Sequence, residues 1–259
     1  MNVRAKKKYG QHFLKDQNIA VKIVNSMDLN IGRNVLEIGP GMGVLTKLLL
    51  QKDVDLKVVE LDAESVHYLE ENFSELANKI VHEDFLKLDL TGIFNGEIQL
   101  IGNLPYNISS QIFFRVLQFR DYIPQAVFMI QREVAERIVS PPGSKTYGIL
   151  SVLLQTFYDT EILFHISPAV FYPPPKVNSA VIKLVRNGRE SLPVSDRLFQ
   201  MIVKHAFNQR RKTLRNALKS VIPKSLNTTD EIFSKRAEQL TNDDFLLLSE
   251  RIHKKNQER

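Results

Sequence analysis

The stretch NVLEIGPGMG, residues 34 to 43, joins an apolar run directly to a glycine-rich turn. Asn34 to Ile38 has the character of a buried strand, and the glycines follow it without a spacer. Glycine allows positive φ angles and close approach of a ligand, and polar ligand groups favour the start of a following helix. We therefore interpret Gly39 and Gly41 as part of a cofactor-binding turn, with an ordinary strand–helix turn as the alternative.

The glycine spacing and the next acidic residue narrow the class of cofactor. The dinucleotide fingerprint is G-x-G-x-x-G, whereas this chain has G-x-G-x-G, with Val44 at the last fingerprint position. Glu60 follows about twenty residues later, at the end of a second predicted strand, where a carboxylate can accept hydrogen bonds from ribose hydroxyls. The pattern predicts a nucleoside cofactor and favours S-adenosylmethionine over NAD.

Strand-like runs alternate with amphipathic segments, such as 44–51 and 63–73, through most of the chain. This alternation favours a doubly wound α/β fold with a mostly parallel, Rossmann-like sheet. The last two strands have no helical pattern between them, which predicts an antiparallel edge. From Val194 onward the pattern is helical. We predict a Rossmann-like methyltransferase domain over 1–187 and a small all-α, RNA-binding domain over 188–259. The expected strands are 34–38, 55–61, 79–82, 98–101, 126–130, 160–166 and 180–185.

Two further strand ends carry polar and aromatic side chains. Asp84 and Phe85 close the third strand, where the acid could accept from an adenine amino group and the ring could stack on the base. An ordinary helix cap is the alternative role for Asp84. Because the carboxyl ends of parallel strands converge on one crevice, we expect both residues in the cofactor site.

The fourth strand ends in NLPY, residues 103 to 106. An adenine amine is a poor nucleophile, so a site that methylates it needs acceptors for its N–H groups. The Asn103 side-chain oxygen offers one acceptor, and the Leu104 carbonyl, held in a turn by Pro105, offers a second. Tyr106 offers a flat face for the base. In this position the tetrapeptide predicts catalysis of methyl transfer to an adenine amine.

The chain resembles the KsgA-type rRNA adenine N6-dimethyltransferases over nearly its whole length. The resemblance rests on eight ordered motifs: YGQHFL (9–14), EIGPGMG (37–43), VELD (59–62), EDF (83–85), NLPYNIS (103–109), QREVAERI (131–138), FYPPPKVNSAV (171–181) and FNQRRKTLRNAL (207–218). It implies dimethylation of two adjacent adenosines in a hairpin loop near the 3′ end of 16S rRNA, within an assembling small ribosomal subunit.

The resemblance also implies site residues. In this family the cofactor is contacted by residues that match His12, Leu14, Gly39, Glu60, Asp84 and Asn103. Position 12 is often asparagine, and histidine can likewise donate and accept a hydrogen bond. Phe171 matches an aromatic residue that presses on the target base opposite Tyr106, with a core residue before a polyproline turn as the alternative.

Two basic segments predict a polyanionic partner in a chain of net charge +6. Residues 197–229 contain no Asp or Glu, and Arg211, Arg215 and Lys219 recur every four residues, which predicts one helical face. A solvated face is the alternative to phosphate binding. The predicted RNA-binding residues are Arg210, Arg211, Lys212, Arg215 and Lys219, and a second cluster comprises Arg4, Lys6, Lys7 and Lys8.

The composition excludes several classes of protein. The 259 residues contain no cysteine, which excludes disulfides, iron–sulfur clusters, thiol nucleophiles and cysteine zinc ligands, and we predict no metal site. No apolar run approaches the roughly 20 residues of a membrane span, and the N-terminus lacks a secretory pattern. We expect a cytoplasmic monomer without a membrane partner.

Three other functions share parts of this pattern. Large-subunit rRNA adenine methyltransferases of the macrolide-resistance type have most of the same motifs. A non-catalytic RNA-binding assembly factor would keep the fold, although the intact Gly39–Gly43, Glu60 and Asn103 set argues against loss of catalysis. A DNA adenine methyltransferase is possible from the site chemistry alone.

Overall fold

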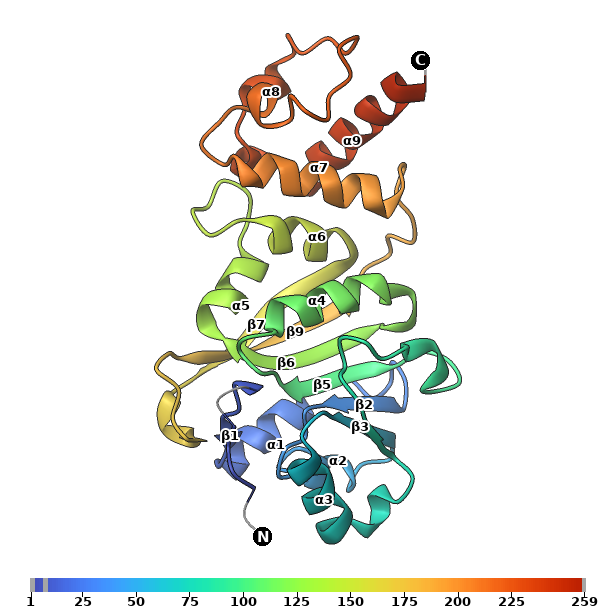
Figure 1. The fold of residues 1–259 in the computed structure, drawn as a ribbon, viewed down its shortest axis with the longest axis vertical. Coiled ribbons are helices and arrows are strands. Elements are labelled where there is room, and N and C mark those ends of the chain that lie inside the picture. Colours follow the sequence, from blue (N-terminus) through green and yellow to red (C-terminus); the bar gives the residue numbers. More distant parts are fainter. Residues whose placement is uncertain (1–2, 7–8, 258–259) are drawn as a thin grey trace. The chain divides into compact units, whose positions relative to one another are not determined.

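The computed structural model describes residues 3–6 and 9–257 (Figure 1). The chain forms two compact units, each built from two separate segments. The first unit contains the described residues up to Ala135 and then Asp159–Arg186, and the second contains Glu136–Tyr158 and the chain from Asn187 onward. The predicted boundary after residue 187 lies within one residue of the last of the three points at which the chain passes between the units, after Arg186. The prediction placed Glu136–Tyr158 in the first domain, whereas the structure groups it with the second because its helix packs against helices there.

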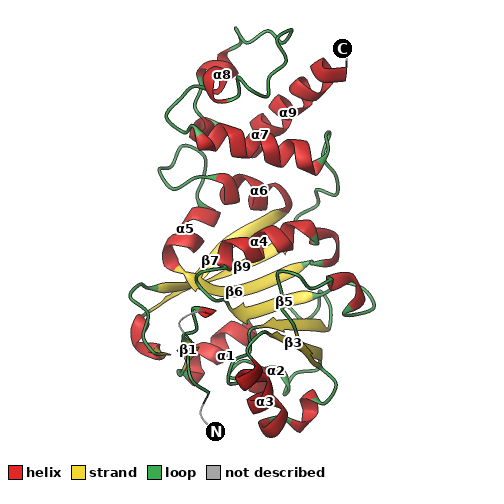
Figure 2. Ribbon diagram, in the orientation of Figure 1, coloured by secondary structure: helices red, strands yellow, loops and turns green. Residues whose placement is uncertain are grey.

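A seven-stranded sheet forms the centre of the first unit, in the order β4-β3-β2-β5-β6-β9-β7 (Figure 2). Strands β2 to β6 pair in parallel, and β9 pairs antiparallel with β6. The fold class is confirmed. The antiparallel strand β9 lies between β6 and β7, and β7 forms the edge of the sheet. The strands are β2 (Asn34–Ile38), β3 (Asp55–Glu60), β4 (Ile80–His82), β5 (Gln99–Asn103), β6 (Gln125–Gln131), β7 (Tyr158–Ile166) and β9 (Ser179–Arg186).

Helices cover both faces of this sheet, as side-chain alternation along β6 shows. Val127 and Met129 belong to one buried cluster with apolar residues of α1 and the α2 region, whereas the Phe128 ring meets Phe113 of α4 edge-on at 5.8 Å. Successive strand residues point to opposite faces, so α1 and α4 lie on opposite sides. Helix α1 (Gln17–Asn25) precedes the first strand of this sheet, and the helices that follow its strands are α2 (Thr46–Leu49), α3 (Ala63–Asn72), α4 (Ser109–Gln118) and α5 (Arg132–Val139).

The helix after the glycine turn is shorter than expected. The predicted amphipathic segment began at Val44, but α2 spans only Thr46–Leu49, and turns connect it to Gly43. Gly39, Gly41 and Gly43 all have positive φ angles, which a right-handed helix does not accommodate. The helix therefore begins only after the glycines end.

A second, two-stranded sheet joins the N-terminal segment to the loop before β9. Strand β1 (Phe13–Leu14) pairs antiparallel with β8 (Phe171–Tyr172), with Leu14 opposite Phe171. Asp16 then caps α1 by accepting hydrogen bonds from the Asn18 and Ile19 N–H groups. The N-terminal segment is thus anchored at its end next to α1.

The second unit is helical, as predicted. It contains α6 (Ile149–Phe157), α7 (Asp196–Asn208), α8 (Leu214–Ala217) and α9 (Asn242–Gln257), and α7 contacts the other three. Phe207 stacks on Phe245 at 5.8 Å within its core. Short 3-10 helices occur in both units at Ser74–Leu76, Leu90–Gly92, Arg120–Tyr122, Pro168–Val170, Glu231–Ser234 and Ala237–Gln239. Along the described chain, no helix combines the length and apolar character that crossing a lipid bilayer requires.

Candidate active site

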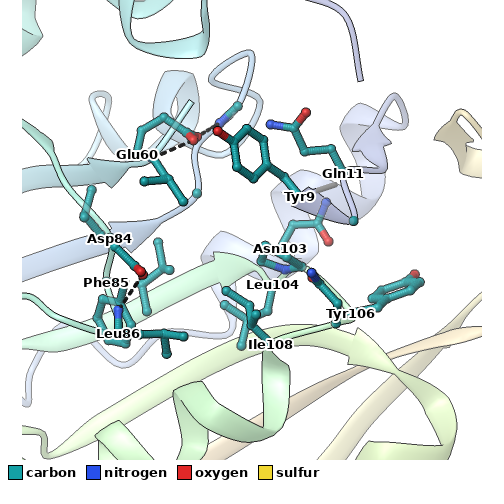
Figure 3. Close-up of a pocket in the computed structure, with 18 of the residues that line it drawn as sticks. Tyr9, Gln11, Glu60, Asp84, Phe85, Leu86, Asn103, Leu104, Tyr106 and Ile108 are labelled. Atoms are coloured by element: carbon teal, nitrogen blue, oxygen red, sulfur yellow. Dashed lines mark hydrogen bonds between the residues drawn. The ribbon is translucent and has the colours of Figure 1, made fainter. Parts of the chain in front are cut away.

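A pocket lies in the first unit, where the parallel strands β2, β3 and β5 end and the chain continues beyond β4 (Figure 3). Glu60 and Asp84 lie at one end of it and Tyr106 at the other, with Asn103 between them. This is the position at which open α/β sheets bind ligands. The lining residues are Tyr9–Phe13, Ile38, Gly39, Gly41, Val59–Leu61, Glu83–Leu86 and Asn103–Ile108.

The glycine turn forms the pocket wall next to β2. Gly39 and Gly41 have φ angles of 65° and 57°, and the Gly39 N–H donates to the Val59 carbonyl at 2.9 Å. Among the described residues other than Gly39 and its two chain neighbours, no heavy atom lies within 4 Å of the point where a Cβ of Gly39 would stand, so the backbone there is open to a ligand. The predicted function of these glycines as a cradle fits this geometry.

Glu60 is 6% exposed, and its carboxylate is held by three backbone groups. The Leu61 and Asp62 N–H groups donate to Oε1 at 2.9 and 2.8 Å, and Gly41 N–H donates to Oε2 at 3.1 Å. Burial raises the pKa of the Glu60 carboxyl, and these hydrogen bonds oppose that effect. A carboxylate has about four lone-pair sites, so roughly one acceptor site remains for a ligand hydroxyl.

Asp84 and Phe85 line the same end of the pocket, as the sequence predicts. Asp84 Oδ1 accepts from the Leu86 N–H at 2.9 Å, so the cap-like role is also present. Phe85 is 5% exposed and packs its ring into the wall. A carboxyl group and an aromatic ring therefore lie at the same end of the pocket as Glu60, and this combination of a hydrogen-bond acceptor and a stacking surface suits a purine nucleoside.

The NLPY turn lines the pocket and contains two acceptors to which no described donor is bound. The Asn103 amide Nδ2 donates to the His12 carbonyl at 2.8 Å, which leaves its oxygen as the acceptor. The Pro105 carbonyl accepts from the Ile108 N–H and the Tyr106 carbonyl from the Ser109 hydroxyl, both at 3.3 Å. Among the described residues, no donor reaches the Leu104 carbonyl. Its own N–H is bound to β6, at 3.0 Å from the Met129 oxygen.

Tyr106 is fixed at both its ring and its hydroxyl. The hydroxyl lies 2.5 Å from Ser179 Oγ, and the ring centroid lies 5.3 Å from that of His12. Burial raises the pKa of the Tyr106 phenol, which keeps it protonated at neutral pH. His12 in turn donates from Nδ1 to the Pro173 carbonyl at 2.7 Å. The predicted aromatic face is thus present, with its orientation set by β9 and by the N-terminal segment.

Two predicted site residues lie elsewhere. Leu14 is 4% exposed and Phe171 is 1% exposed, and both belong to the apolar core rather than to the pocket lining. The pairing of β1 with β8 places these two residues opposite one another, which directs both side chains into the core. The structure thus differs from the expected position of Phe171 opposite Tyr106. The neighbouring Tyr172 is 64% exposed.

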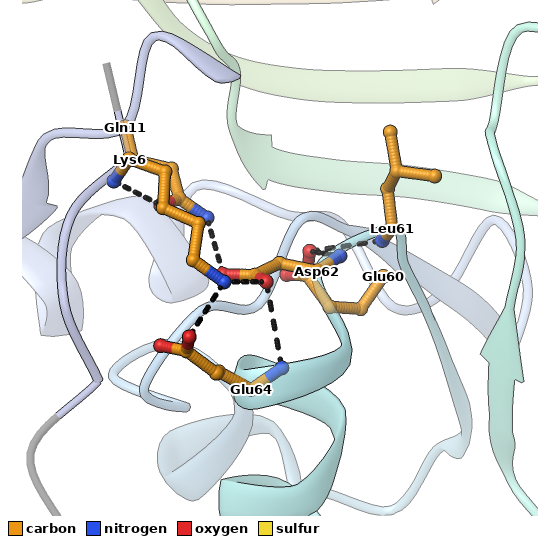
Figure 4. A network of polar contacts seen from close by, with 6 residues as sticks. All are labelled: Lys6, Gln11, Glu60, Leu61, Asp62 and Glu64. Carbon is orange, nitrogen blue, oxygen red and sulfur yellow. Dashed lines mark hydrogen bonds and ion pairs between the residues drawn. The ribbon is translucent and has the colours of Figure 1, made fainter. Parts of the chain in front are cut away.

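Some functional candidates were not predicted from the sequence. Tyr9, Gln11 and Phe13 line the pocket, although only His12 and Leu14 were expected as site residues from that segment. Figure 4 shows a polar network in which the ammonium of Lys6 lies between Asp62 and Glu64. The motifs YGQHFL and VELD contain most of these residues. Membership in these motifs is therefore the sequence feature from which the residues could have been predicted.

Glu37 was also missed as a candidate. It is 1% exposed, and the Thr46 hydroxyl donates to its Oε2 at 2.6 Å. Burial raises the pKa of Glu37 from 4.5 to about 8, with a smaller upward contribution from Glu60 and an opposing one from the Thr46 hydrogen bond. This raised pKa favours the protonated, neutral form of Glu37 at pH 7.

The basic residues of the second unit do not form one helical face. Helix α7 ends at Asn208 and α8 begins at Leu214, because Thr213 is extended and the Leu214 N–H pairs with the Lys235 carbonyl. Arg215 donates from Nε and Nη2 to the Thr228 carbonyl at 3.1 and 2.6 Å. Arg210 donates to the Ser144 carbonyl and lies 3.7 Å from Glu238. The other predicted residues, Arg211, Lys212 and Lys219, are exposed.

Only part of the second basic cluster can be placed. Lys7 and Lys8 lie outside the described residues, and Lys6 is paired with Asp62 and Glu64. An ammonium paired with two carboxylates contributes little to a positive surface. The expectation that Lys6 belongs to a phosphate-binding cluster therefore does not fit its contacts.

Comparison with known proteins identifies close relatives. A family model described as ribosomal RNA adenine dimethylase matches residues 2–254. "Ribosomal RNA small subunit methyltransferase A" of Parabacteroides distasonis is 56% identical, over 95% of this chain and 93% of the relative. The protein of the same name from Flavobacterium johnsoniae is 55% identical, over 96% of each chain.

Solved structures share the fold. A dimethyladenosine transferase from Plasmodium falciparum superposes with a TM-score of 0.80 at 24% identity, covering 95% of this chain and 98% of its own. The 23S rRNA methyltransferase ErmE superposes with a TM-score of 0.67 at 24% identity, covering 93% of this chain and 99% of its own. At these identities the likeness establishes the fold alone.

Proposed function

Because the chain is a methyltransferase that belongs to the ribosomal RNA adenine dimethylase family, we propose that it dimethylates the N6 amines of two adjacent adenosines in a hairpin loop near the 3′ end of 16S rRNA. The methyl donor would be S-adenosylmethionine. The enzyme would act as a monomer in the cytoplasm, on the assembling small ribosomal subunit. The observation that carries the proposal is the Asn103 amide, which the His12 carbonyl fixes next to the Leu104 carbonyl, an acceptor that no described donor reaches.

The residues at one end of the pocket fit the nucleoside part of the cofactor. Glu60 would accept a hydrogen bond from a ribose hydroxyl, and the open backbone at Gly39 would allow close approach. Asp84 would accept from the adenine amino group, and Phe85 would lie against the ring. When bound, the cofactor supplies an electrophilic methyl group on a cationic sulfonium, which suits a pocket with aromatic walls.

The other end of the pocket would hold the target adenine. The Asn103 oxygen and the Leu104 carbonyl would accept the two N–H groups of the amine, which directs its lone pair at the methyl group. Pro105 has no N–H that could compete at this position, and Tyr106 would stack on the base. The amine loses a proton during or after transfer, so a strong general base is not required.

The proposal is tested by mass spectrometry of rRNA from a strain that lacks the gene. We expect 16S rRNA from this strain to contain two adjacent unmodified adenosines that are dimethylated in the parent, and a plasmid copy to restore them. Unchanged 16S rRNA together with loss of a methyl mark from 23S rRNA would support the large-subunit alternative. A parent protein that fails to bind S-adenosylmethionine in calorimetry would support a non-catalytic assembly factor.

Glu60→Gln is expected to weaken S-adenosylmethionine binding by at least tenfold, because a hydrogen bond to a charged group is worth about 1.5–3 kcal/mol. Glutamine keeps one oxygen for the Leu61 and Asp62 N–H groups, which alanine would leave unpaired. Calorimetric titration measures the effect, with the exposed Glu75→Gln as the control. Equal affinities of parent and Glu60→Gln would contradict the ribose assignment.

Arg211→Glu combined with Lys212→Glu is expected to weaken RNA binding and reduce its salt dependence. Each lost phosphate contact lowers the slope of log K against log salt by about 0.7–0.9, depending on the strandedness of the RNA. Lys22→Glu with Lys47→Glu changes the net charge equally on exposed lysines of the first unit and serves as the control. Filter binding over a salt series measures both slopes, and equal slopes for the two double variants would favour a solvated face.

A further inference from the structure

The N-terminal segment forms one wall of the pocket. Residues Tyr9–Phe13 line it, and this wall packs closely against Gly41 and Asn107, which also line the pocket. A Cβ added to Gly41 would lie 2.8 Å from the Phe13 ring, and one added to Gly10 would lie 2.7 Å from Asn107 Oδ1. A ligand that fills the pocket would therefore be covered on this side by the N-terminal segment.

The far end of this wall is joined to the chain that follows Glu60. Lys6 Nζ lies 2.5 Å from Asp62 Oδ1 and 3.0 Å from Glu64 Oε1 (Figure 4). The Lys6 backbone N–H donates to Gln11 Oε1 at 2.8 Å, and Gln11 Nε2 donates to Asp62 Oδ2 at 3.4 Å. Lys6, Gln11 and Asp62 thus form a closed ring of contacts, and Gln11 belongs to the pocket wall itself.

Asp62 depends on this ring because its carboxylate is nearly buried. Its side chain is 3% exposed, whereas that of Lys6 is 26% exposed. Burial raises the pKa of Asp62, but the hydrogen bonds from Lys6 and Gln11 outweigh this effect and hold the pKa below its usual value. A buried carboxylate that loses its cation is costly. The Asp62 N–H also donates to Glu60 Oε1, so the ring continues directly into the proposed ribose acceptor.

We propose that Lys6 is a positioning residue for the cofactor: by pairing with Asp62 it holds the N-terminal wall closed over the pocket and slows cofactor release. This inference rests on the proposed function. Strand β1 anchors the other end of the wall to β8, and the Asn103 amide binds the His12 carbonyl in its middle. Opening the wall at Lys6 would therefore free one end of the segment while β1 remains paired.

Lys6→Met tests the proposal, because methionine keeps an unbranched apolar stem and removes the charge. In stopped-flow measurements without RNA, we expect S-adenosylmethionine to dissociate roughly three- to tenfold faster, in keeping with a partly exposed ion pair. With saturating cofactor and RNA, kcat should stay within about twofold of the parent. Lys6→Arg should restore slow release, since arginine can pair with both carboxylates.

Two control variants separate this role from general charge effects. Lys15→Met removes an exposed lysine that does not line the pocket, and should leave the release rate unchanged. Glu64→Gln removes the outer partner and should change the rate less than Lys6→Met, because Asp62 remains. If the parent binds the cofactor but Lys6→Met releases it at the parental rate, the positioning role is wrong. If the parent does not bind the cofactor, the proposed function itself fails.

The same variant distinguishes cofactor positioning from phosphate binding. Should Lys6 instead contact RNA, Lys6→Met would lower RNA affinity and its salt dependence while cofactor release without RNA stayed unchanged. That result would overturn the inference and support the interpretation of Lys6 as a member of the phosphate-binding cluster.

Discussion

Asn103→Ala should lower the single-turnover rate of methylation by about 10²–10³, with RNA and S-adenosylmethionine both saturating. The Asn103 oxygen is a preorganised acceptor that acts when positive charge develops on the attacking nitrogen. Its geometry depends on the hydrogen bond of 2.8 Å from Nδ2 to the His12 carbonyl, which sets which atom of the amide faces the substrate. Rapid-quench measurements of methyl incorporation give the rate.

The substitution also frees the His12 carbonyl, so some loss of cofactor affinity is expected and must be separated from the loss of rate. Saturating cofactor removes that contribution. Asn72→Ala, an exposed asparagine on α3 whose amide donates to the Tyr68 carbonyl, is the matched control. RNA affinity should change little. A parental rate for Asn103→Ala would mean that NLPY is a structural turn only.

The second large expected effect is a dependence of the protein's stability on pH, and it comes from Glu37. In the folded protein the pKa of Glu37 is about 8, above its ordinary value of 4.5. Between these values the folded state holds a proton that the unfolded state has released, so the free energy of unfolding decreases as pH rises. The stabilisation that comes from the raised pKa of Glu37 is complete below about pH 4.5 and is lost by about pH 8. Between these values the free energy of unfolding falls with a slope approaching 1.4 kcal/mol per pH unit.

Glu37→Gln has no proton to release, so the difference in unfolding free energy between parent and variant should follow this slope. Urea denaturation at several pH values from 5.5 to 8.5 measures it, and the variant should gain stability relative to the parent as pH rises. The exposed Glu70→Gln on α3 should run parallel to the parent. A constant difference between Glu37→Gln and the parent would show that Glu37 is ionised in the folded state at neutral pH.

The sequence predicts the sheet well because its strands are defined by local pattern. The predicted strand at 34–38 matches β2, and the predicted 55–61 matches β3 within one residue. The sequence also indicates that Glu60 and Asn103 lie in one pocket, since each stands at a strand end that topology brings to one edge of the sheet. The position of a motif at a strand end therefore predicts those pocket residues whose placement depends on the order of the strands in the sheet.

What the sequence did not predict depends on contacts between distant residues. The pairing of Lys6 with Asp62 joins residues that no local pattern relates. The direction of the Phe171 side chain follows from the pairing of β1 with β8, and an apolar residue before prolines fits a core or a pocket equally well. The contact of Arg215 was also not predicted. Its periodic spacing indicates one face of a helix, whereas its guanidinium binds the Thr228 carbonyl.

The insertion of β9 between β6 and β7 has a consequence for the order of events during translation. Strand β6 leaves the ribosome long before β9, and the intervening chain includes a segment of the second unit. At about 5–20 residues per second, β6 waits for a few seconds before its antiparallel partner exists. Tyr106 receives its Ser179 hydrogen bond only then. The nascent chain can thus assemble its parallel strands early, but we expect it to gain a complete substrate site only after β9 has been synthesised.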